Sequence, residues 1–406
     1  MKKIVIAGLM MDTNLGEEVY PQCIQYLLNE YIEEPVEFID LDLYGRVVRC
    51  EDNTTKKKSE RLLGSREYNR IERKIIKEYI PDIEDPEKKK HAMWNVNPNN
   101  RRRLYKIYLE KIKGANLVLF AGGGLIECSL NHDYYHHIDL ITKIANRLRI
   151  PVCFNAVGRV LDPNYMYGWR IMRKALRRRC VKYITCRDGA EWIDEYCFKG
   201  KRKIATIPCS AIWTAEAYSA KKNDEADIVG IGAIRENIFS SYQKDFSKED
   251  MLQLYKEIVF CLKQRGYKCC IFTNGYSRDY EFALKVQEEL RKDGIEVSVL
   301  ERPENSRILV NQLKNFKGII TARLHSCIIA YSLKIPTIAI SWTNKISDFM
   351  DLIECPESAI EMEKLNADYM VDMFEHQLNT NYDEKRYLEL RERVMKEVEC
   401  ICSFIK

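Results

Sequence analysis

Short apolar runs alternate with helix-length segments along the whole chain, and this alternation restricts the fold more than any other feature. The runs are rich in β-branched residues and apolar on both faces, which is typical of parallel strands covered by helices on each side. They lie at residues 3–9, 36–42, 115–122, 151–158, 182–188, 203–209, 226–233, 267–274, 295–300, 318–322 and 336–341. The pattern predicts an α/β protein with two doubly wound, Rossmann-like domains.

The expected domain boundary lies within residues 211–227, where the apolar pattern lapses and charged residues accumulate. We therefore expect an N-terminal domain over residues 1–215, with an insertion at about 44–103, and a C-terminal domain over residues 226–380. Residues 384–406 place apolar side chains near helical spacing and predict a C-terminal helix. These side chains belong to Tyr387, Leu388, Leu390, Val394, Val398 and Ile401.

Composition limits the partners and the compartment. The 406 residues are 46% hydrophobic and 31% charged, which suits a globular chain with two cores. The net charge of +5, from 65 basic and 60 acidic residues, is too small to indicate a nucleic-acid partner. The fifteen cysteines are irregularly spaced and form no C-x-x-C pair, so we expect reduced thiols and a cytoplasmic protein. No run of 18 apolar residues predicts a membrane span.

Three cationic or titratable side chains follow two adjacent strand candidates in the second half. Arg323 and His325 come directly after the run at 318–322, and Lys345 follows the run at 336–341. In an open parallel sheet, ligands bind beyond the carboxyl ends of the strands, where helix N-termini offer N–H groups and partial positive charge. The sequence therefore predicts an anion site that contains a titratable histidine.

The first half also carries informative turns after its strand candidates. Asn14 and Glu17 follow the first strand, the glycines Gly122, Gly123 and Gly124 follow the third, and Arg187 follows the fifth. Glycines allow a backbone to approach a ligand closely. Because all these turns lie on the carboxyl side of their strands, we expect a cleft between two facing sheets.

Four segments resemble those of a known family, the polysaccharide pyruvyl transferases. The longest, "TARLHSCIIAYSLKIPTIAISWTNKISDFM", is similar to the family's R-L-H segment and the lysine that follows it. "TNLGEE" resembles the family's N-x-G-D-E turn, "GGGL" its glycine turn and "TCRDGAEW" its R-D turn. The resemblance extends through most of the chain.

The resemblance implies a two-domain fold similar to the glycosyltransferase B arrangement. It also implies transfer of the enolpyruvyl unit of phosphoenolpyruvate onto sugar hydroxyls, followed by closure to a ketal, with no cofactor and no metal. Position by position, the donor would be bound by Arg187, Arg323 and Lys345, with His325 as the catalytic group. Acceptor binding is associated with Asn14, Glu17, Gly122, Gly123 and Gly124. The acceptor would be a sugar or a lipid-linked oligosaccharide, with peripheral association with a membrane and no nucleic acid.

The chain departs from the family pattern at three places. Glu17 stands where the family usually has Asp, which keeps the charge on a longer side chain. "AVGRVLDP" replaces a glycine-rich stretch and keeps only Gly158, and the segment 44–103 has no counterpart.

The chemistry of this transfer calls for an acid or base with a pKa near neutral and for cations that hold a carboxylate and a phosphate. We expect His325 to be the general acid or base. Arg187 and Lys345 fall in different predicted domains, so a donor held by both would bridge the expected cleft. Two other classes stay open: a nucleotide-sugar glycosyltransferase of the same architecture, and a non-catalytic binding protein of this fold.

Two further segments have two interpretations each. His132, Asp133 and His136 have the spacing of a metal pair on a helix, although a polar helix face is the simpler interpretation. Residues 170–179 form a basic helix, which is either a solvated crossover helix or a surface for a diphosphate-linked or lipid-linked acceptor at a membrane.

Overall fold

The structure is a computed structural model, and it describes residues 1–47, 98–128, 133–161, 166–236, 238–239 and 246–405. Most of the expected insertion, residues 48–97, therefore lies outside the described residues, as does His132. Contacts between Cα atoms divide the chain into two compact units. Unit 1 comprises Met1–Asp12, Ile24–Cys209 and Met395–Lys406, and unit 2 comprises Thr13–Cys23 and Ser210–Val394.

These units differ from the expected domains in two respects. The segment Thr13–Cys23, expected in the N-terminal domain, belongs to unit 2 by its contacts. The C-terminal helix α16 (Glu384–Cys402) is shared, because its residues from Met395 onward belong to unit 1.

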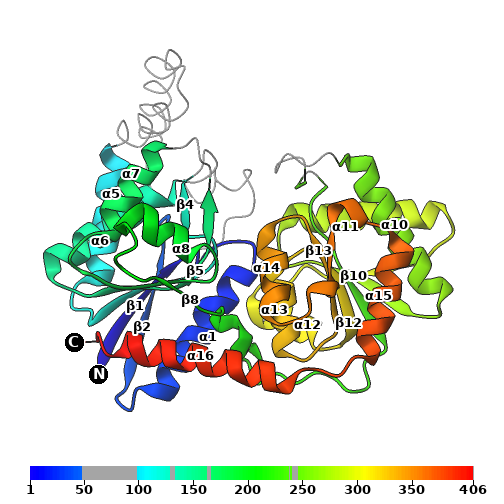
Figure 1. Ribbon diagram of the computed structural model, residues 1–406. Coiled ribbons are helices and arrows are strands. Elements are labelled where there is room, and N and C mark those ends of the chain that lie inside the picture. Colours follow the sequence, from blue (N-terminus) through cyan, green and yellow to red (C-terminus); the bar gives the residue numbers. More distant parts are fainter. Residues whose placement is uncertain (48–97, 129–132, 162–165, 237, 240–245, 406) are drawn as a thin grey trace, which may run out of the picture. The chain divides into compact units, whose positions relative to one another are not determined.

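Unit 1 contains a six-stranded parallel sheet with the order β2-β1-β3-β5-β7-β8 (Figure 1). Two further strands pair with each other outside this sheet. The six strands of the sheet are β1 (Lys2–Gly8), β2 (Val36–Asp42), β3 (Leu117–Ala121), β5 (Val152–Val157), β7 (Val181–Cys186) and β8 (Ala205–Thr206). The separate pair is β4 (Ile126–Cys128) and β6 (Arg159–Leu161).

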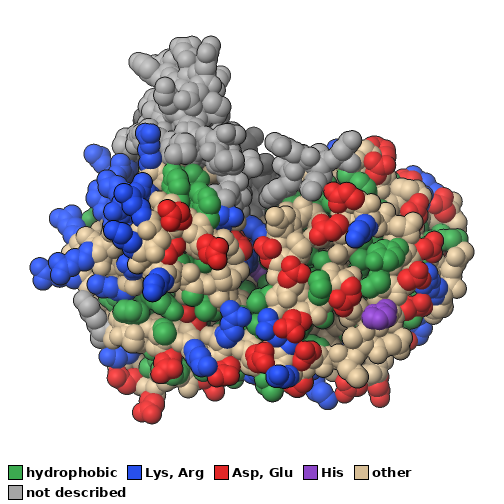
Figure 2. Space-filling model, viewed as in Figure 1, with side chains coloured by type: hydrophobic (Ala, Val, Ile, Leu, Met, Phe, Trp, Pro, Cys, Tyr) green, Lys and Arg blue, Asp and Glu red, His purple; other side chains and the backbone are tan. Residues whose placement is uncertain are grey.

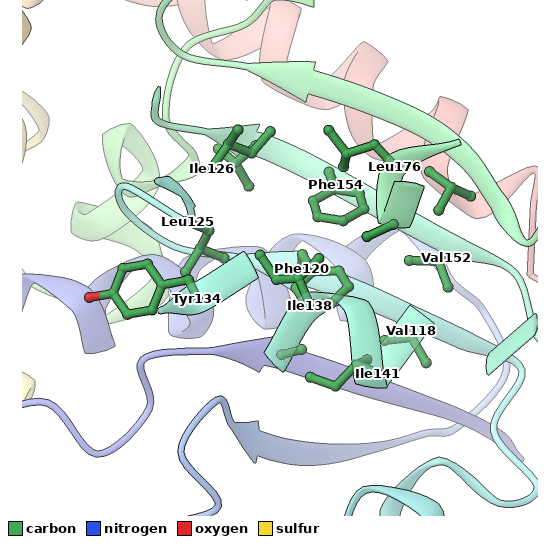
Figure 3. Close-up of a cluster of buried hydrophobic side chains, with 14 of the residues drawn as sticks. Val118, Phe120, Leu125, Ile126, Tyr134, Ile138, Ile141, Val152, Phe154 and Leu176 are labelled. Atoms are coloured by element: carbon green, nitrogen blue, oxygen red, sulfur yellow. The ribbon is translucent and has the colours of Figure 1, made fainter. Parts of the chain in front are cut away.

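The helices of unit 1 bury their apolar side chains against this sheet. They are α1 (Gly16–Tyr31), which begins in unit 2, α5 (Pro98–Ile112), α6 (Tyr134–Leu148), α7 (Met166–Leu176) and α8 (Ala190–Ile193), which continues as a π-helical turn over Asp194–Phe198. Figure 3 shows part of the core, where Phe120 of β3 stacks on Phe154 of β5 with ring centroids 4.4 Å apart. Ile138 and Ile141 of α6 are fully buried in the same cluster.

Unit 2 contains a second six-stranded parallel sheet, with the order β11-β10-β9-β12-β13-β14 (Figure 1). Its strands are β9 (Ile228–Gly232), β10 (Lys268–Phe272), β11 (Ser298–Val299), β12 (Phe316–Thr321), β13 (Thr337–Ser341) and β14 (Ala359–Glu361). Its helices are α9 (Thr214–Ala217), α10 (Lys248–Gln264), α11 (Ser277–Lys292), α12 (Ser306–Leu313), α13 (Leu324–Ser332), α14 (Asn344–Leu352) and α15 (Ala367–Asn379). Short 3₁₀ turns cover Ser210–Trp213, Pro356–Ser358 and Met362–Lys364.

Local sequence signals explain several helix boundaries in unit 2. Ser247 and Asp250 form a capping box at the start of α10, in which each side chain accepts a backbone N–H of the other residue. Asn305 caps α12 by accepting from the backbone N–H of Ile308 at 3.0 Å. These caps satisfy N–H groups that have no partner inside the helix.

The predicted α/β class with two parallel sheets is confirmed, and every predicted strand run contains a strand. The runs at 203–209 and 295–300 yield strands of only two residues, β8 and β11, and both lie at sheet edges. The predicted C-terminal helix is also confirmed as α16, although Leu388 is 54% exposed and does not join the buried face.

The interpretation of His132, Asp133 and His136 as a polar helix face is wrong for His136, and His132 lies outside the described residues. His136 and His137 lie in the first turn of α6 and are 5% and 2% exposed. His137 Nδ1 lies 2.9 Å from the hydroxyl of Tyr108 on α5, and burial lowers the pKa of His137 to about 4. The Tyr108 hydroxyl on α5 thus gives the buried His137 a polar partner. Within the described part of the chain, no group of three or more His, Cys, Asp or Glu side chains could hold a metal ion.

None of the described helices is both long enough and apolar enough to cross a membrane.

Candidate active site

The strand order of unit 2 reverses at one position of the sheet, between β9 and β12. The chain runs from β9 outward to β10 and β11, then returns to add β12 on the other side of β9. The connections after β9 and β12 therefore leave the sheet in opposite directions, which opens a crevice at their carboxyl ends where ligands bind in such folds. Arg235 follows β9 at this point, and Arg323 follows β12.

A buried carboxylate fixes both of these connections. Asp279, in the first turn of α11, is fully buried and forms an ion pair with the guanidinium of Arg323. The same carboxylate accepts a hydrogen bond from the backbone N–H of Arg235 at 2.9 Å. Burial raises the pKa of Asp279, and the charge of Arg323 opposes this rise. Asp279 itself lies on α11, which follows β10. One carboxylate therefore connects the segments that follow β9, β10 and β12.

The two guanidinium groups converge on one aromatic ring. The guanidinium carbons of Arg235 and Arg323 lie 5.3 Å and 5.9 Å from the ring centroid of Tyr276, the residue that precedes α11. The Nε of Arg323 is buried and has no hydrogen-bond partner among the described residues. Two guanidinium groups at one point of the sheet edge can bind a phosphate or a carboxylate through charge-assisted hydrogen bonds.

His325 is the second residue of α13 and follows Arg323 by two positions. It is 6% exposed, and its Nδ1 lies 3.9 Å from a carboxylate oxygen of Glu17 in the first turn of α1. A carboxylate beside an imidazole holds the ring in one orientation. The structure thus gives His325 a carboxylate neighbour at the sheet edge, and its role as a titratable group stays a prediction.

The glycine of the N-terminal turn makes this contact geometrically possible. A Cβ atom built on Gly16 would lie 2.4 Å from the Cβ of His325 and 2.5 Å from its Nδ1. Any side chain at position 16 would collide with the base of the imidazole, which is held by the α13 backbone. The spacing of "NLGEE" is explained by this packing: glycine admits the histidine, and the next residue supplies the carboxylate.

Hydrogen bonds on both sides hold the N-terminal turn within unit 2. The backbone N–H of Leu15 donates to the carbonyl of Asn274 at 2.9 Å, and the Asn274 side chain accepts from the hydroxyl of Ser326 at 2.6 Å. The carboxylate of Glu18 accepts the backbone N–H of Ser306 at 2.9 Å, at the N-terminus of α12. These bonds fix Glu17 because they anchor the residues on either side of it.

Two other predicted site residues lie in unit 2. Asn14 is half-buried in the same turn, where its carbonyl accepts the backbone N–H of Glu17 at 3.0 Å. Lys345 is half-buried in the first turn of α14, which follows β13, the strand that pairs with β12. Both residues thus follow carboxyl ends of strands, as the sequence predicted.

The remaining predicted residues form a cluster within unit 1. The Arg187 side chain is 10% exposed, and its Nε lies 3.3 Å from a carboxylate oxygen of Asp188. A Cβ on Gly158 would lie 2.8 Å from the same Nε, so the retained glycine accommodates the guanidinium. The N–H of Gly158 donates to the carbonyl of Gly123 at 2.7 Å. The glycine turn, with Gly122 and Gly123 buried and Gly124 half-buried, is thereby closed against the exit of β5.

Comparison with known proteins assigns the family. The sequence pattern of the polysaccharide pyruvyl transferase family matches residues 14–344, which is well over half of the chain. The chain belongs to the polysaccharide pyruvyl transferase family. This family is one of enzymes, so the resemblance noted in the sequence is confirmed. Among curated proteins, no relative matches.

Solved structures share the fold at low sequence identity. A UDP-GlcNAc 2-epimerase from Methanocaldococcus jannaschii has a TM-score of 0.52 and 14% identity, with 94% of each chain covered. A putative UDP-N-acetylglucosamine 2-epimerase from Listeria monocytogenes has a TM-score of 0.53 and 10% identity, with 97% of this chain and 91% of that chain covered. An α,α-trehalose 6-phosphate synthase from Burkholderia multivorans has a TM-score of 0.50 and 9% identity, with coverage of 99% and 97%. The predicted glycosyltransferase-B-like fold is confirmed.

Sequence reasoning missed Arg235, Tyr276 and Asp279. The rule that identified Arg323, a charged residue directly after a strand, also applies to Arg235, which follows the run at 226–233 within "GAIREN". Asp279 had a weaker signal, because an acid in the first turn of a helix is usually explained by the helix dipole alone.

Proposed function

We propose that this family member transfers the pyruvyl unit of phosphoenolpyruvate onto hydroxyl groups of a sugar in a cell-surface polysaccharide or its precursor, and closes it to a ketal. The observation that carries the proposal is twofold: the guanidinium groups of Arg235 and Arg323 lie near one ring at the exits of β9 and β12, and His325, with its carboxylate partner Glu17, follows Arg323 by two positions at the start of α13. A proton donor next to an anion site is the combination that this reaction requires.

In the proposed step, protonated His325 gives its proton to the methylene carbon of phosphoenolpyruvate. The neighbouring carbon, which carries the phosphate ester and the carboxylate, becomes cation-like and is attacked by an acceptor hydroxyl. That hydroxyl passes its proton to the now neutral His325. A second hydroxyl then attacks the same carbon as the carbon–oxygen bond to phosphate breaks, and the proton of the second hydroxyl leaves with the phosphate. The products are a pyruvate ketal and inorganic phosphate. Glu17 stabilises the imidazolium before transfer and holds its orientation.

The donor's two anionic groups need fixed cations. In this proposal Arg323 and Arg235 bind the phosphate or the carboxylate through forked hydrogen bonds, and Lys345 supplies a further charge at the same sheet edge. The family resemblance adds Arg187 to the donor-binding residues. No cofactor enters the scheme, because side chains supply the positive charge.

The acceptor side rests on the resemblance. It associates Asn14, Glu17 and the glycines Gly122, Gly123 and Gly124 with a sugar or lipid-linked oligosaccharide. Glu17 would then serve two purposes, since its carboxylate also faces His325 at 3.9 Å.

The test is a panel of donors titrated into the protein by calorimetry. We expect phosphoenolpyruvate to bind, and UDP-, GDP- and CMP-sugars to bind weakly or not at all. The nucleotide sugars are included because the proteins of similar fold include UDP-GlcNAc 2-epimerases. Tight binding of a nucleotide sugar together with no binding of phosphoenolpyruvate would contradict the proposal and favour a glycosyltransferase. Donor binding without phosphate release, with any acceptor, would favour a non-catalytic binding protein.

The roles of Arg187 and Lys345 are tested in the same titration. Arg187→Ala and Lys345→Ala should each weaken donor binding by about 1.5–3 kcal/mol, the scale of a hydrogen bond to a charged group. Unchanged affinity in Arg187→Ala would return Arg187 to a structural role within unit 1, where it contacts Asp188 and Gly158.

A further inference from the structure

One face of unit 1 carries a concentration of positive charge that the proposed chemistry does not use. Helix α6 packs against both α5 and α7, and exposed cationic side chains project from all three helices and from the residues that follow α6 and α7. Figure 2 shows Lys and Arg side chains gathered over α5, α6 and α7, at the left of the view. We call this surface the basic face. Its exposed residues are Arg101, Arg102, Lys106, Lys143, Arg147, Arg149, Arg170, Lys174, Arg177 and Arg179.

Acidic side chains do not balance this charge. Helix α7 contains no acidic residue, α6 contains only Asp139, which pairs with Arg178 at 2.6 Å, and α5 contains only the exposed Glu110. Lys143, Arg147 and Lys174 form no ion pair with any acid in the described part of the chain, and the same holds for Arg170, Arg177 and Arg179. Such a concentration costs free energy through mutual repulsion. An anionic partner would offset that cost.

The cations of unit 2 show the opposite arrangement on an exposed helix. On α11, Lys285 pairs with Glu236 at 2.7 Å, Arg291 with Glu288 at 3.2 Å and Lys292 with Glu289 at 2.7 Å. These three side chains are as exposed as those of the basic face, yet their charge is neutralised locally. The accumulation on unit 1 is therefore specific to that face and is not a general property of the surface.

We propose that the basic face docks the protein onto a membrane surface containing anionic lipids. Lysine and arginine side chains near such a surface are attracted by its negative potential, and their alkyl stems lie along the boundary between headgroups and acyl chains. Leu148, which is 37% exposed between Arg147 and Arg149, supplies an apolar side chain that can enter this boundary. The protein lies on the bilayer in this proposal and does not span it.

The composition of the face favours lipid over nucleic acid. Single-stranded nucleic acid is bound by exposed aromatic side chains on which bases stack. The large hydrophobic side chains exposed on the described residues include none that is aromatic on α5, α6 or α7. The sequence pI of about 8.4 is also below the value above 9 that is typical of nucleic-acid-binding domains.

The experiment is co-sedimentation of the full chain with phosphatidylcholine vesicles, with and without phosphatidylglycerol. The test variant is Arg147→Gln/Lys174→Gln/Arg177→Gln, and the control is Lys285→Gln/Arg291→Gln/Lys292→Gln, which removes the same charge from α11. We expect the wild type and the control to bind phosphatidylglycerol vesicles in a salt-sensitive manner. The test variant should bind roughly 100-fold more weakly, from about fivefold for each cation removed. Circular dichroism of both variants checks that they fold.

Three results would overturn the proposal. The first is equal binding of the wild type to vesicles with and without phosphatidylglycerol, and the second is an equal loss in the test and control variants. The third is tighter binding of a single-stranded oligonucleotide than of vesicles through the same three residues, which would assign the face to nucleic acid.

Discussion

The carboxyl edges of the two sheets are built from different groups. In unit 2 the strand order reverses between β9 and β12, and the exits of these strands carry the guanidinium groups of Arg235 and Arg323, followed by His325. In unit 1 it reverses between β1 and β3, and the exit of β3 carries the glycine turn. There the carbonyl of Gly123 accepts a backbone hydrogen bond from Gly158. One edge presents charged side chains, and the other presents main chain.

This difference teaches that topology positions a site without supplying its chemistry. Both sheets are parallel, both have a reversal in strand order, and both hold a buried carboxylate beside a strand exit: Asp279 pairs with Arg323 in unit 2, and Asp42 pairs with Arg46 in unit 1. The exits at the reversal in unit 2 differ because they bring two guanidinium groups to one aromatic ring. The segment Thr13–Cys23 strengthens the contrast, because it follows the first strand of unit 1 but brings Glu17 to unit 2. The predictions that follow test whether catalysis and donor binding depend on the charged edge.

The largest effect should come from His325→Ala, which removes the proposed proton donor. We expect turnover to fall roughly 10²- to 10⁴-fold, the usual range for a general acid–base group, while phosphoenolpyruvate still binds. Steady-state phosphate release and calorimetric titration measure the two quantities separately. Near-normal turnover would remove His325 from the mechanism.

Donor binding should depend on the arginine pair. Arg235→Ala removes one guanidinium but keeps the backbone N–H that donates to Asp279, so the fold should be retained. Affinity for phosphoenolpyruvate should fall by about 1.5–3 kcal/mol, and Arg235→Lys should not restore it fully, because an ammonium cannot form a forked contact. Arg291→Ala, on the exposed face of α11, is the matched control. Equal affinity in Arg235→Ala and Arg291→Ala would place the donor elsewhere.

A pair of glycine substitutions compares the packing of the two edges. Gly16→Ala would press a methyl group against the base of His325, which cannot move without α13. It should lower the free energy of unfolding by about 1–3 kcal/mol, the usual cost of overpacking. Gly158→Ala meets only the far end of the Arg187 side chain, so it should cost less. Urea denaturation measures both, and a larger loss in Gly158→Ala would contradict this account of the edges.

The smallest effect concerns a buried carboxylate of unit 1. Glu397 of α16 is 2% exposed and accepts hydrogen bonds from Tyr183 at 3.0 Å and Asn155 at 3.3 Å. Burial raises the pKa of Glu397, and these hydrogen bonds oppose the rise. Because the pKa is higher in the folded state, the contribution of this group to stability is present below the unfolded pKa of about 4.3 and is lost as the pH rises through the folded value.

Glu397→Gln removes the ionisable group, so the variant does not lose stability through this group as the pH rises. The unfolding free energy of the variant, relative to the wild type, should therefore increase as the pH rises from about 4 to about 7. Glu399→Gln, an exposed substitution on the same helix, should show no such trend. Denaturation of both variants across this pH range measures the effect. The same change of unfolding free energy with pH in the two variants would contradict the prediction.

Much of the fold could be predicted because its signals are local. The run at 336–341 is largely apolar over a strand length and contains the parallel strand β13. The run at 36–42 carries Glu37, Asp40 and Asp42 among its apolar residues and contains the edge strand β2. The short strand β14 was missed, because its three residues at the sheet edge carry no periodic signal. The strand-exit positions of Arg323 and Lys345 followed from the same local pattern.

The sequence by itself determined two parallel α/β sheets, the family, and the strand exits that carry Arg323, His325 and Lys345. Only the tertiary structure decided which partners these side chains have. Glu18 accepts a hydrogen bond from the backbone of Ser306, which lies 288 residues further along the chain. The neighbouring residue, Glu17, likewise pairs with His325, which is also distant in sequence. Periodicity reports which face of an element is buried, but it contains no information about which distant segment covers that face. The pairing of Asp279 with Arg323, and the need for glycine at position 16, arise only when such segments meet.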